Sequence, residues 1–443
     1  MNTVPGPHGD RLLGNLRAFR NRPLQLLLQC RCEYGDVVKL RLGPFSVYLV
    51  FNPQDIVRVF DDKSFGRSDF SALFEPLAGG SMIIADGEQW LRQRHRVAPA
   101  FNKNRLAMLA PQIHKNAVEI VEQWETEQQA GHLIDVQEAM VGYAMKVITH
   151  FLFGSGLDNK MLVAVAKAWS MSLKSMNYRM SEALPLPLWV PTRNNRHLRS
   201  AANEISKIIL DIIAQQRKTP DDSGSFLSTL LHNRDQDSEL KDQEILHEIM
   251  GIFLAGFDTV AIAMVWTLYY LARYPDIQTQ VRQEMLTTLK ETKEGHLGFA
   301  NLPYFDNVFS EAIRLRPPLW LVDRKSSTET ELGGYHIPPN SNIILSPYVT
   351  HRDSRFWDNP AVFNPARFEH TEEREKYAYF PFGGGHMRCI GIGLTKLEAQ
   401  IIIGEILKRY RIELSALHPV EIDCLFVLRS KEGLWMRLTH LNY

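Results

Sequence analysis

The residues best suited to redox chemistry lie near the carboxyl end, in a glycine-rich run that contains one cysteine. The run from Phe382 to Gly391 reads FGGGHMRCIG, and an apolar helical pattern follows it from Leu394. Glycines allow a tight backbone path, and the start of a helix stabilises a thiolate through its free N–H groups and dipole. Cys389 is therefore a candidate anionic ligand for iron. A phosphate-binding loop would explain the glycines but not the cysteine, and the P-loop pattern is missing.

A second chemical group interrupts the most apolar helical stretch of the chain. Ala255-Gly256-Phe257-Asp258-Thr259 places a glycine, an acid and a hydroxyl in an apolar setting, where glycine and an unpaired carboxylate both cost stability. Thr259 can donate to the carbonyl of Ala255 and open the helix. An oxygen pocket would use all three: space at Gly256, a hydroxyl at Thr259 and a proton relay at Asp258. A satisfied buried polar patch is the alternative.

Two further patterns combine charged and aromatic residues at helical spacing. Glu311 and Arg314 share a helix face, and Arg367 follows as a possible third member of an ion-pair network. An ordinary surface pair is the alternative. Trp90 and Arg94 also share a face, and their N–H groups suit carboxylates, although a solvated basic face would look similar.

The elements that must position these residues are mostly helical. Alternation over Val37–Val50 around Gly43-Pro44 predicts a β-hairpin, and Gly333-Gly334 with Asn340-Ser341 punctuates a small β-region. Asp242 is expected to cap the long buried helix, which continues to Arg273. The other predicted helices lie within Gln89–Phe153, interrupted at Pro99 and Pro111, and at Met161–Met180, Asn203–Gln216, Asp306–Leu315 and Leu394–Tyr410. We therefore expect a mainly α protein with a smaller β portion.

Bulk composition excludes several classes of protein. The 443 residues carry 50 basic and 50 acidic side chains, so nothing points to a nucleic-acid partner. Four cysteines, Cys30, Cys32, Cys389 and Cys424, do not form a disulfide framework in a chain this long. The first residues contain no apolar core and no run reaches about 18 uncharged apolar residues. We expect a soluble, cytoplasmic monomer without a membrane span, unless an anchor has been removed from the amino-terminal end.

Taken together and in this order, the motifs resemble the cytochrome P450 family along nearly the whole chain. The order is Trp90 with Arg94, then Ala255–Thr259, then Glu311–Arg314, then Pro365–Phe368, then the Cys389 run. The resemblance implies one triangular, mostly helical domain over residues 1–443 that encloses haem, with no fused reductase.

The resemblance also implies roles for individual residues. Cys389 would be the axial ligand of the iron of haem b, and Asp258 with Thr259 the acid–alcohol pair that delivers protons during oxygen activation. Glu311, Arg314 and Arg367 would form a structural triad. The haem-binding residues would be Trp90, Arg94, Arg324, Phe382, His386 and Arg388. One departure concerns Met387, since the family usually has arginine or histidine two residues before the cysteine; His386 or Arg388 would then replace that contact.

The implied activity is a monooxygenase reaction in which one atom of O₂ enters a lipophilic substrate by hydroxylation or epoxidation. Electrons would come from NAD(P)H only indirectly, through a ferredoxin or flavodoxin and its reductase. An isomerase or a peroxide-dependent oxygenase on the same scaffold is the alternative, and a haem sensor without enzymatic activity is disfavoured by the Asp258–Thr259 pair. The sequence leaves the substrate's identity and the choice of redox partner open.

Family position also marks candidate pocket residues, nearly all apolar, as a lipophilic substrate requires. An ordinary core role is the alternative for each of them. They are Phe70, Phe74, Leu77, Met82, Met176, Met180, Ala255, Val260, Leu319, Val322, Phe426 and Val427. Arg179 lies beside them as a possible anchor for a carboxylate.

Overall fold

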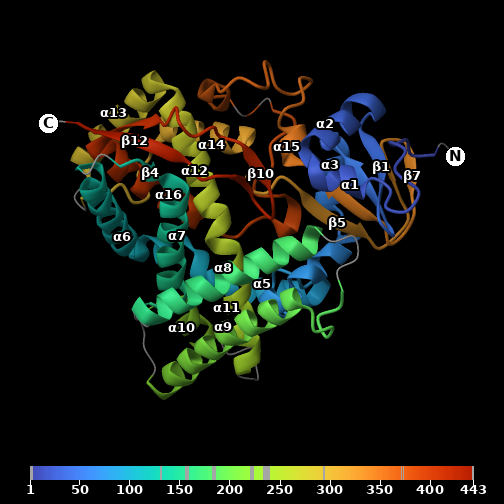
Figure 1. The fold of residues 1–443 in the computed structure, drawn as a ribbon, viewed down its shortest axis with the longest axis horizontal. Helices are drawn as coiled ribbons and strands as arrows, with labels where there is room; N and C mark the ends of the chain where they lie inside the picture. The colour runs from blue at the N-terminus through green and yellow to red at the C-terminus, as the bar shows by residue number, and fades with distance from the viewer. Residues whose placement is uncertain are drawn as a thin grey trace.

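The computed structural model describes residues 3–129, 132–154, 159–181, 186–219, 224–232, 240–292, 295–370, 372 and 374–441. Helices occupy most of the molecule, and the β1–β2 hairpin lies at the side where the amino terminus emerges (Figure 1). The prediction of a mainly α chain with a smaller β portion is confirmed.

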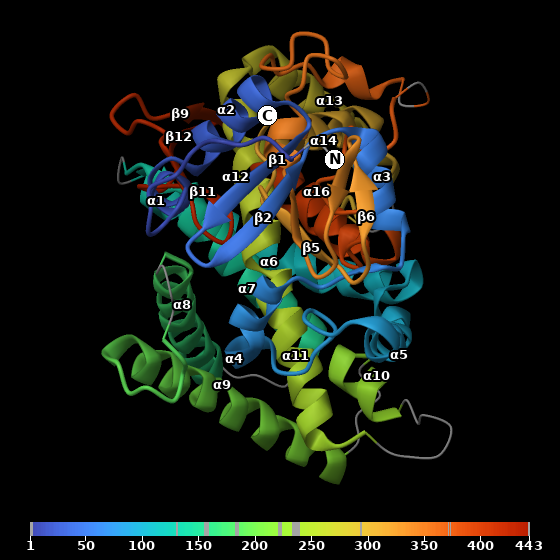
Figure 2. The same ribbon diagram turned by 90° about the vertical axis from the view of Figure 1, so that its right-hand side faces the viewer.

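The long apolar stretch forms the central helix, and it is broken where the sequence carries its polar residues. Helices α11 (Asp242–Gly256) and α12 (Asp258–Arg273) meet at Phe257, and together they run through the middle of the molecule (Figure 2). By length and composition this stretch could cross a membrane, but it is mostly buried among the other described helices, as expected of a core helix. The expected cap was wrong by one residue: Lys241 precedes the helix, and its N–H donates to Glu244 at 3.0 Å.

Helices from both halves of the chain surround this centre. Helix α7 (Val136–Phe153) packs against α12, and α6 (Lys103–Gln129) packs against α16 (Ile392–Arg409). The expected interruption at Pro111 is wrong, because α6 continues through it. The other helices that carry motifs are α5 (Gly87–Val97) and α14 (Pro303–Leu315).

A helix pair covers one end of the molecule. Helix α8 (Asn159–Ser181) packs along α9 (Arg193–Lys218), which lies at the foot of Figure 2. Helix α9 begins ten residues before the expected Asn203, because Thr192 caps it by accepting from the Asn195 N–H. The remaining helices are α1 (Leu16–Asn21), α2 (Pro23–Tyr34), α3 (Pro53–Asp61), α4 (Glu75–Ala78), α10 (Phe226–His232), α13 (Pro275–Glu291) and α15 (Pro347–Thr350), with short 3₁₀ turns at Asp69–Phe74 (η1), Ala98–Phe101 (η2), Pro365–Phe368 (η3) and Gly385–Met387 (η4).

The strands form small sheets around this helical body. The predicted hairpin is confirmed as β1 (Val37–Leu42) and β2 (Phe45–Val50), and it extends into a five-stranded sheet in the order β1-β2-β8-β5-β3. Its other strands are β8 (Asn342–Leu345), β5 (Val322–Ser326) and β3 (Phe65–Gly66). Two strand pairs are β6 (Thr330–Leu332) with β7 (Tyr335–Ile337) and β10 (Ile422–Cys424) with β11 (Leu428–Ser430). A three-stranded sheet has the order β4 (Ile134–Asp135), β12 (Trp435–His440), β9 (Tyr410–Leu414).

Candidate active site

The cysteine run forms a tight loop immediately before α16. Gly383 and Gly385 have φ angles of 67° and 63°, which favour glycine. A Cβ on Gly385 would lie 1.9 Å from the carbonyl oxygen of Phe60, so α3 leaves no space for a side chain there. The Cys389 N–H donates to the carbonyl of Phe382 at 3.0 Å. These contacts fix the direction of the cysteine side chain.

Cys389 faces a cavity beside the central helix. The cysteine is exposed into this cavity, whose wall also includes Ala255, Gly256 and Thr259 from the break between α11 and α12. The surrounding protein raises the pKa of the thiol through burial, whereas the Gly391 N–H and the nearby arginines oppose that rise. The structure therefore brings together two motifs that are separated by about 130 positions in the sequence.

Basic and indole N–H groups line the same cavity. Trp90 and Arg94 of α5 are joined there by Arg67 and Arg388. Among the described residues none of these three arginines has a carboxylate within ion-pair distance, and the Nε of Arg67 is buried without a hydrogen-bond partner. Burial lowers the pKa of Arg67, and the charges of Asp323 and Asp86 oppose this fall. A thiol that shares a cavity with several arginines suits a metal cofactor that carries carboxylates.

The other expected cofactor residues lie nearby but in different roles. Arg324 is buried, donates to the carbonyl of Asp323 at 2.8 Å and lies over the ring of Phe60. Burial lowers the pKa of Arg324 to about 10, and the charge of Arg67 acts in the same direction. The ring of His386 packs edge-on against Trp90 at 5.3 Å. Arg324, Phe382 and His386 do not line the cavity that Cys389 faces, whereas Met387 does.

The acid and the hydroxyl of the central helix point to different partners. Thr259 Oγ1 donates to the carbonyl oxygen of Ala255 at 2.7 Å, as the sequence predicted. Asp258 is buried and accepts from Arg429 Nη2 of β11 at 2.7 Å. Burial raises the pKa of Asp258, and Arg429 opposes this rise. Of the two residues, only Thr259 lines the cavity. Asp258 lies outside the lining and is bound by Arg429 of β11, a contact that the sequence analysis did not predict.

Glu311, Arg314 and Arg367 meet in one buried network. Arg314 donates to both carboxylate oxygens of Glu311, at 2.5 and 2.8 Å, and Arg367 Nε donates to Glu311 at 3.0 Å. Glu311 and Arg314 are fully buried, which excludes the surface-pair alternative. Arg314 also donates to the carbonyl of His351 at 2.6 Å.

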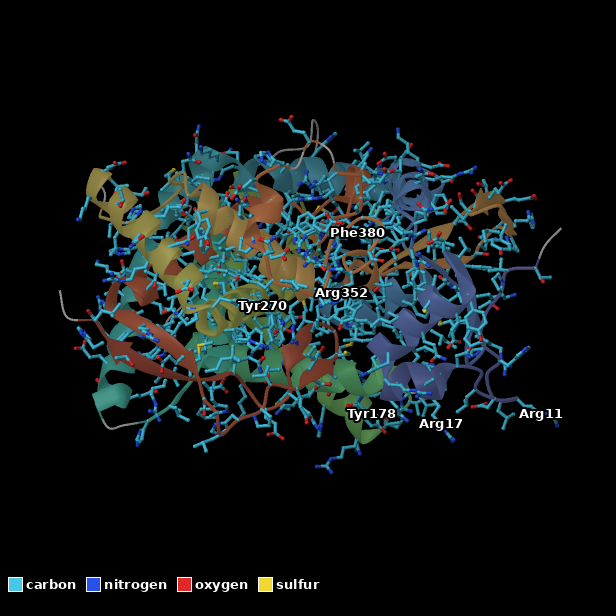
Figure 3. The ribbon with its side chains drawn as sticks, turned by 90° about the horizontal axis from the view of Figure 1, so that it is seen from above. Arg11, Arg17, Tyr178, Tyr270, Arg352 and Phe380 are labelled. Atoms are coloured by element: carbon cyan, nitrogen blue, oxygen red, sulfur yellow. The ribbon has the colours of Figure 1, made fainter. Side chains whose placement is uncertain are left out.

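His351 connects this network to the cysteine loop, and sequence reasoning missed it. Its Nε2 accepts from the Phe380 N–H at 2.9 Å, so the ring proton lies on Nδ1, which faces the carbonyl of Arg314 at 3.3 Å. Burial, followed by the charge of Arg314, holds the pKa of His351 well below its usual value. Phe380 and Arg352, the residue that follows His351, lie near the middle of the molecule when it is seen from above (Figure 3). The neutral ring of His351 therefore fixes the backbone at Phe380, just before the cysteine loop.

The candidate pocket residues divide into three groups. Met82, Ala255 and Val260 line the cavity at Cys389, whereas Phe70, Phe74, Leu319 and Phe426 line a larger second cavity. Leu77, Met176 and Val427 are buried core residues that line neither, and Val322 of β5 packs beside the core of the five-stranded sheet. The side chain of Met180 lies outside the described part of the structure.

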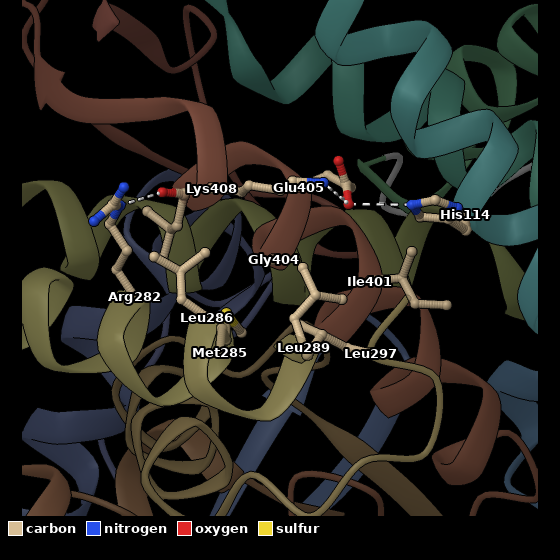
Figure 4. A pocket seen from close by; sticks show the side chains of 11 residues that line it. His114, Arg282, Met285, Leu286, Leu289, Leu297, Ile401, Gly404, Glu405 and Lys408 are labelled. Carbon is tan, nitrogen blue, oxygen red and sulfur yellow. Dashed lines mark hydrogen bonds and ion pairs between the residues drawn. The ribbon is translucent and has the colours of Figure 1, made fainter. Parts of the chain in front are cut away.

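A separate small cavity lies on the far side of α16. His114, Arg282 and Glu405 border it, and His114 Nε2 lies 3.1 Å from the Glu405 carboxylate (Figure 4). Its volume of about 10 Å³ leaves space for at most one water molecule. It is therefore not a substrate site.

Comparison with known proteins agrees with this geometry. The sequence model of the family described as Cytochrome P450 matches residues 4–436. Cyclooctatin synthase of Streptomyces melanosporofaciens is 30% identical over 91% of this chain and 89% of its own. Pentalenene oxygenase of Streptomyces avermitilis is 26% identical over 99% of this chain and 97% of its own. A structure described as retinoic acid-bound cyanobacterial CYP120A1 has the same fold, with a TM-score of 0.88, 21% identity and coverage of 99% and 100% of the two chains.

Proposed function

This chain belongs to the cytochrome P450 family, and from that membership we propose how its own residues oxygenate a lipophilic substrate. The relationship makes the chain an oxidoreductase, a monooxygenase that uses haem and O₂. When bound, the haem supplies the iron at which O₂ is activated, so that one oxygen atom enters the substrate while two electrons and two protons convert the other to water. The observation that carries the proposal is the meeting of Cys389 and Thr259 in one cavity.

The residues of the first cavity fit haem b. Cys389 would bind the iron through its sulfur, and Arg67, Arg94 and Arg388 with Trp90 would hold the two propionates. In this arrangement Arg388 and Arg67 take the place of the contact that Met387 cannot make. Arg324 does not line the cavity, but its charge interacts with the charge of Arg67 and lowers the pKa of His386.

Proton delivery would depend on Thr259, Asp258 and Arg429. Because Thr259 donates its own proton to Ala255, its Oγ1 lone pairs are left to accept a hydrogen bond inside the cavity. Asp258 would resupply protons from behind. Arg429 donates to the carboxylate at 2.7 Å and opposes the rise in the pKa of Asp258 that burial causes. Release from Arg429 would therefore let burial favour the protonated acid further.

The electrons would come from a separate ferredoxin or flavodoxin with its reductase, and from NAD(P)H only through them. The chain would act as a soluble, cytoplasmic monomer. The curated relatives have names that refer to cyclooctat-9-en-7-ol and pentalenene, and the apolar pocket residues of this chain support a lipophilic substrate here too.

The decisive experiment is the absorbance spectrum of the reduced, carbon monoxide-bound protein, which reports thiolate ligation directly. We expect the thiolate signature in the wild type and its loss in Cys389→Ala, whereas Cys424→Ala is the matched control and should keep it. An unchanged spectrum in Cys389→Ala would refute the proposal. Turnover that requires O₂ and reductant separates the monooxygenase from the isomerase and peroxide-dependent alternatives.

A further inference from the structure

The segment between α4 and α5, residues 79–86, forms part of the wall of the cavity at Cys389 and lies against the central helix. Met82 and Ile83 of this segment line the cavity, and so does Ile252 of α11. Helix α4 packs against α11, and the two lie side by side in Figure 2. The position of the segment relative to α11 therefore affects the shape of the cavity.

Two glycines allow the segment to approach α11 closely. Gly79 has a φ of 53°, and a Cβ there would collide with the ring of His247. A Cβ on Gly251 would collide with Ser81 Oγ. His247 and Gly251 are one helical turn apart, and Glu248 lies between them on the same side of the helix. One face of α11 thus receives the segment.

Glu248 is the acid of this face, and it binds the backbone of the segment. Its Oε2 accepts from the Met82 N–H at 3.2 Å, and only 4% of the residue is exposed. Its Oε1, like Ser81 Oγ, is buried without a hydrogen-bond partner among the described residues. Burial raises the pKa of Glu248 to about 7, and the Met82 N–H and the charge of Arg96 oppose this rise. Packing alone does not require a carboxyl group here, because burying one is costly.

The backbone of Met82 is also bound by a residue that lines the same cavity. Arg67 Nη2 donates to the Met82 carbonyl oxygen at 3.4 Å. Arg67 lines the cavity and is one of the residues proposed above to hold a propionate. A chain of contacts therefore runs from Glu248 through the backbone of Met82 to Arg67. Without the Glu248 contact, Met82 could move away from α11, and Arg67 would lose an acceptor at a fixed position.

We propose that Glu248 is a positioning residue for the cofactor site, which holds the backbone of Met82 against α11 so that the Met82 carbonyl keeps Arg67 in place to bind a haem propionate. Glu248 itself does not line the cavity. This inference rests on the proposed function, because it assumes that haem occupies the first cavity. The role requires a hydrogen-bond acceptor and not a charge, so glutamine should replace Glu248 and leucine should not.

The rate at which haem leaves the enzyme tests this role without a measurement of turnover. Haem-loaded proteins are first checked for the thiolate signature with carbon monoxide and are then mixed with excess apomyoglobin, and the transfer of haem is followed by absorbance. Glu248→Leu should lose haem at least about fivefold faster than the wild type, because it leaves the buried Met82 N–H without an acceptor. Glu248→Gln should stay within about twofold of the wild type, because its Oε1 can accept from the same N–H.

Glu284→Leu is the matched control. Glu284 also accepts from the backbone of another element, the N–H groups of Tyr304 and Phe305 at 2.8 Å, but it does not line the cavity. This variant should lose haem within about twofold of the wild-type rate. Equal haem loss from Glu248→Leu and Glu284→Leu would overturn the inference. Haem loss from Glu248→Gln as fast as from Glu248→Leu would also overturn it, since the charge and not the acceptor would then matter.

A double substitution tests the route through Arg67. In an Arg67→Leu background, Glu248→Leu should change the rate of haem loss by less than about twofold, because the contact that Glu248 supports is already absent. A full effect in that background would refute the route. A wild type without the thiolate signature would refute the proposed function itself, whereas a wild type that shows the signature and a Glu248→Leu variant that loses haem at the wild-type rate would refute only the present inference.

Discussion

Replacing His351 with glutamine should remove part of the enzyme's sensitivity to acid. Burial and the charge of Arg314 hold the pKa of His351 well below its usual value, so the folded protein keeps the ring neutral. In the unfolded chain the same ring takes up a proton as the pH falls through about 6.5. The stability contributed by this neutral ring is therefore present above that pH and is lost progressively below it.

The size of the effect follows from the unfolded state alone. Between pH 7.5 and pH 5.0, protonation of one unfolded histidine lowers the free energy of unfolding by about 2 kcal/mol. Glutamine does not titrate, yet its Oε1 can still accept from the Phe380 N–H that His351 Nε2 binds at 2.9 Å. The wild type should thus lose about 2 kcal/mol more than His351→Gln over this interval, because all other titrating groups are common to both proteins.

Urea unfolding followed by circular dichroism, at both pH values and on haem-loaded protein, measures this difference. His95→Gln is the matched control, because it also removes one histidine but from the exposed surface of α5. Equal losses of stability in the wild type and His351→Gln would refute the argument, and so would an equal effect of His95→Gln.

Three further substitutions probe the network, the loop and the acid. Arg314→Leu should lower the free energy of unfolding by about 3–5 kcal/mol because it leaves a buried carboxylate short of its main partner, and Arg367→Leu should cost less because Arg367 is partly exposed; equal costs in denaturant unfolding would contradict this ranking. Gly385→Ala forces a side chain into a position with φ of 63° and no space, so the thiolate signature with carbon monoxide should fall; a spectrum like that of the wild type would show that the loop adapts. Arg429→Leu removes the cation that opposes the rise in the pKa of Asp258 caused by burial, so the alkaline limb of kcat against pH should move to higher pH. An unmoved limb would exclude Asp258 from proton delivery.

The sequence predicted those features that depend on residues close together in the chain. The β1–β2 hairpin was predicted from alternation around Gly43-Pro44, and the Thr259 bond to Ala255 from their spacing of one helical turn. The grouping of Glu311 with Arg314 follows from the same local geometry.

The features that it missed depend on long-range packing. Arg429 approaches Asp258 from 171 positions away. His351, at the end of α15, reaches Arg314 of α14 and Phe380 before the cysteine run only through long-range packing. Leu77 and Val427 are as apolar as the residues that line the two cavities, yet both are buried and line neither of them. Periodicity reports the face of an element and not what lies opposite that face.

The contact between α3 and the cysteine loop has a consequence for how the protein is made. Asp61 accepts from Lys376 and from the Tyr377 hydroxyl, that hydroxyl accepts from the Gly385 N–H, and Phe60 leaves no space beside the glycines. The ribosome makes these partners more than 300 residues apart. During synthesis, Phe60 and Asp61 are therefore made long before the loop residues that they contact. The loop around Cys389 can take its final conformation, and the cysteine can bind iron, only after nearly the whole polypeptide has been synthesised.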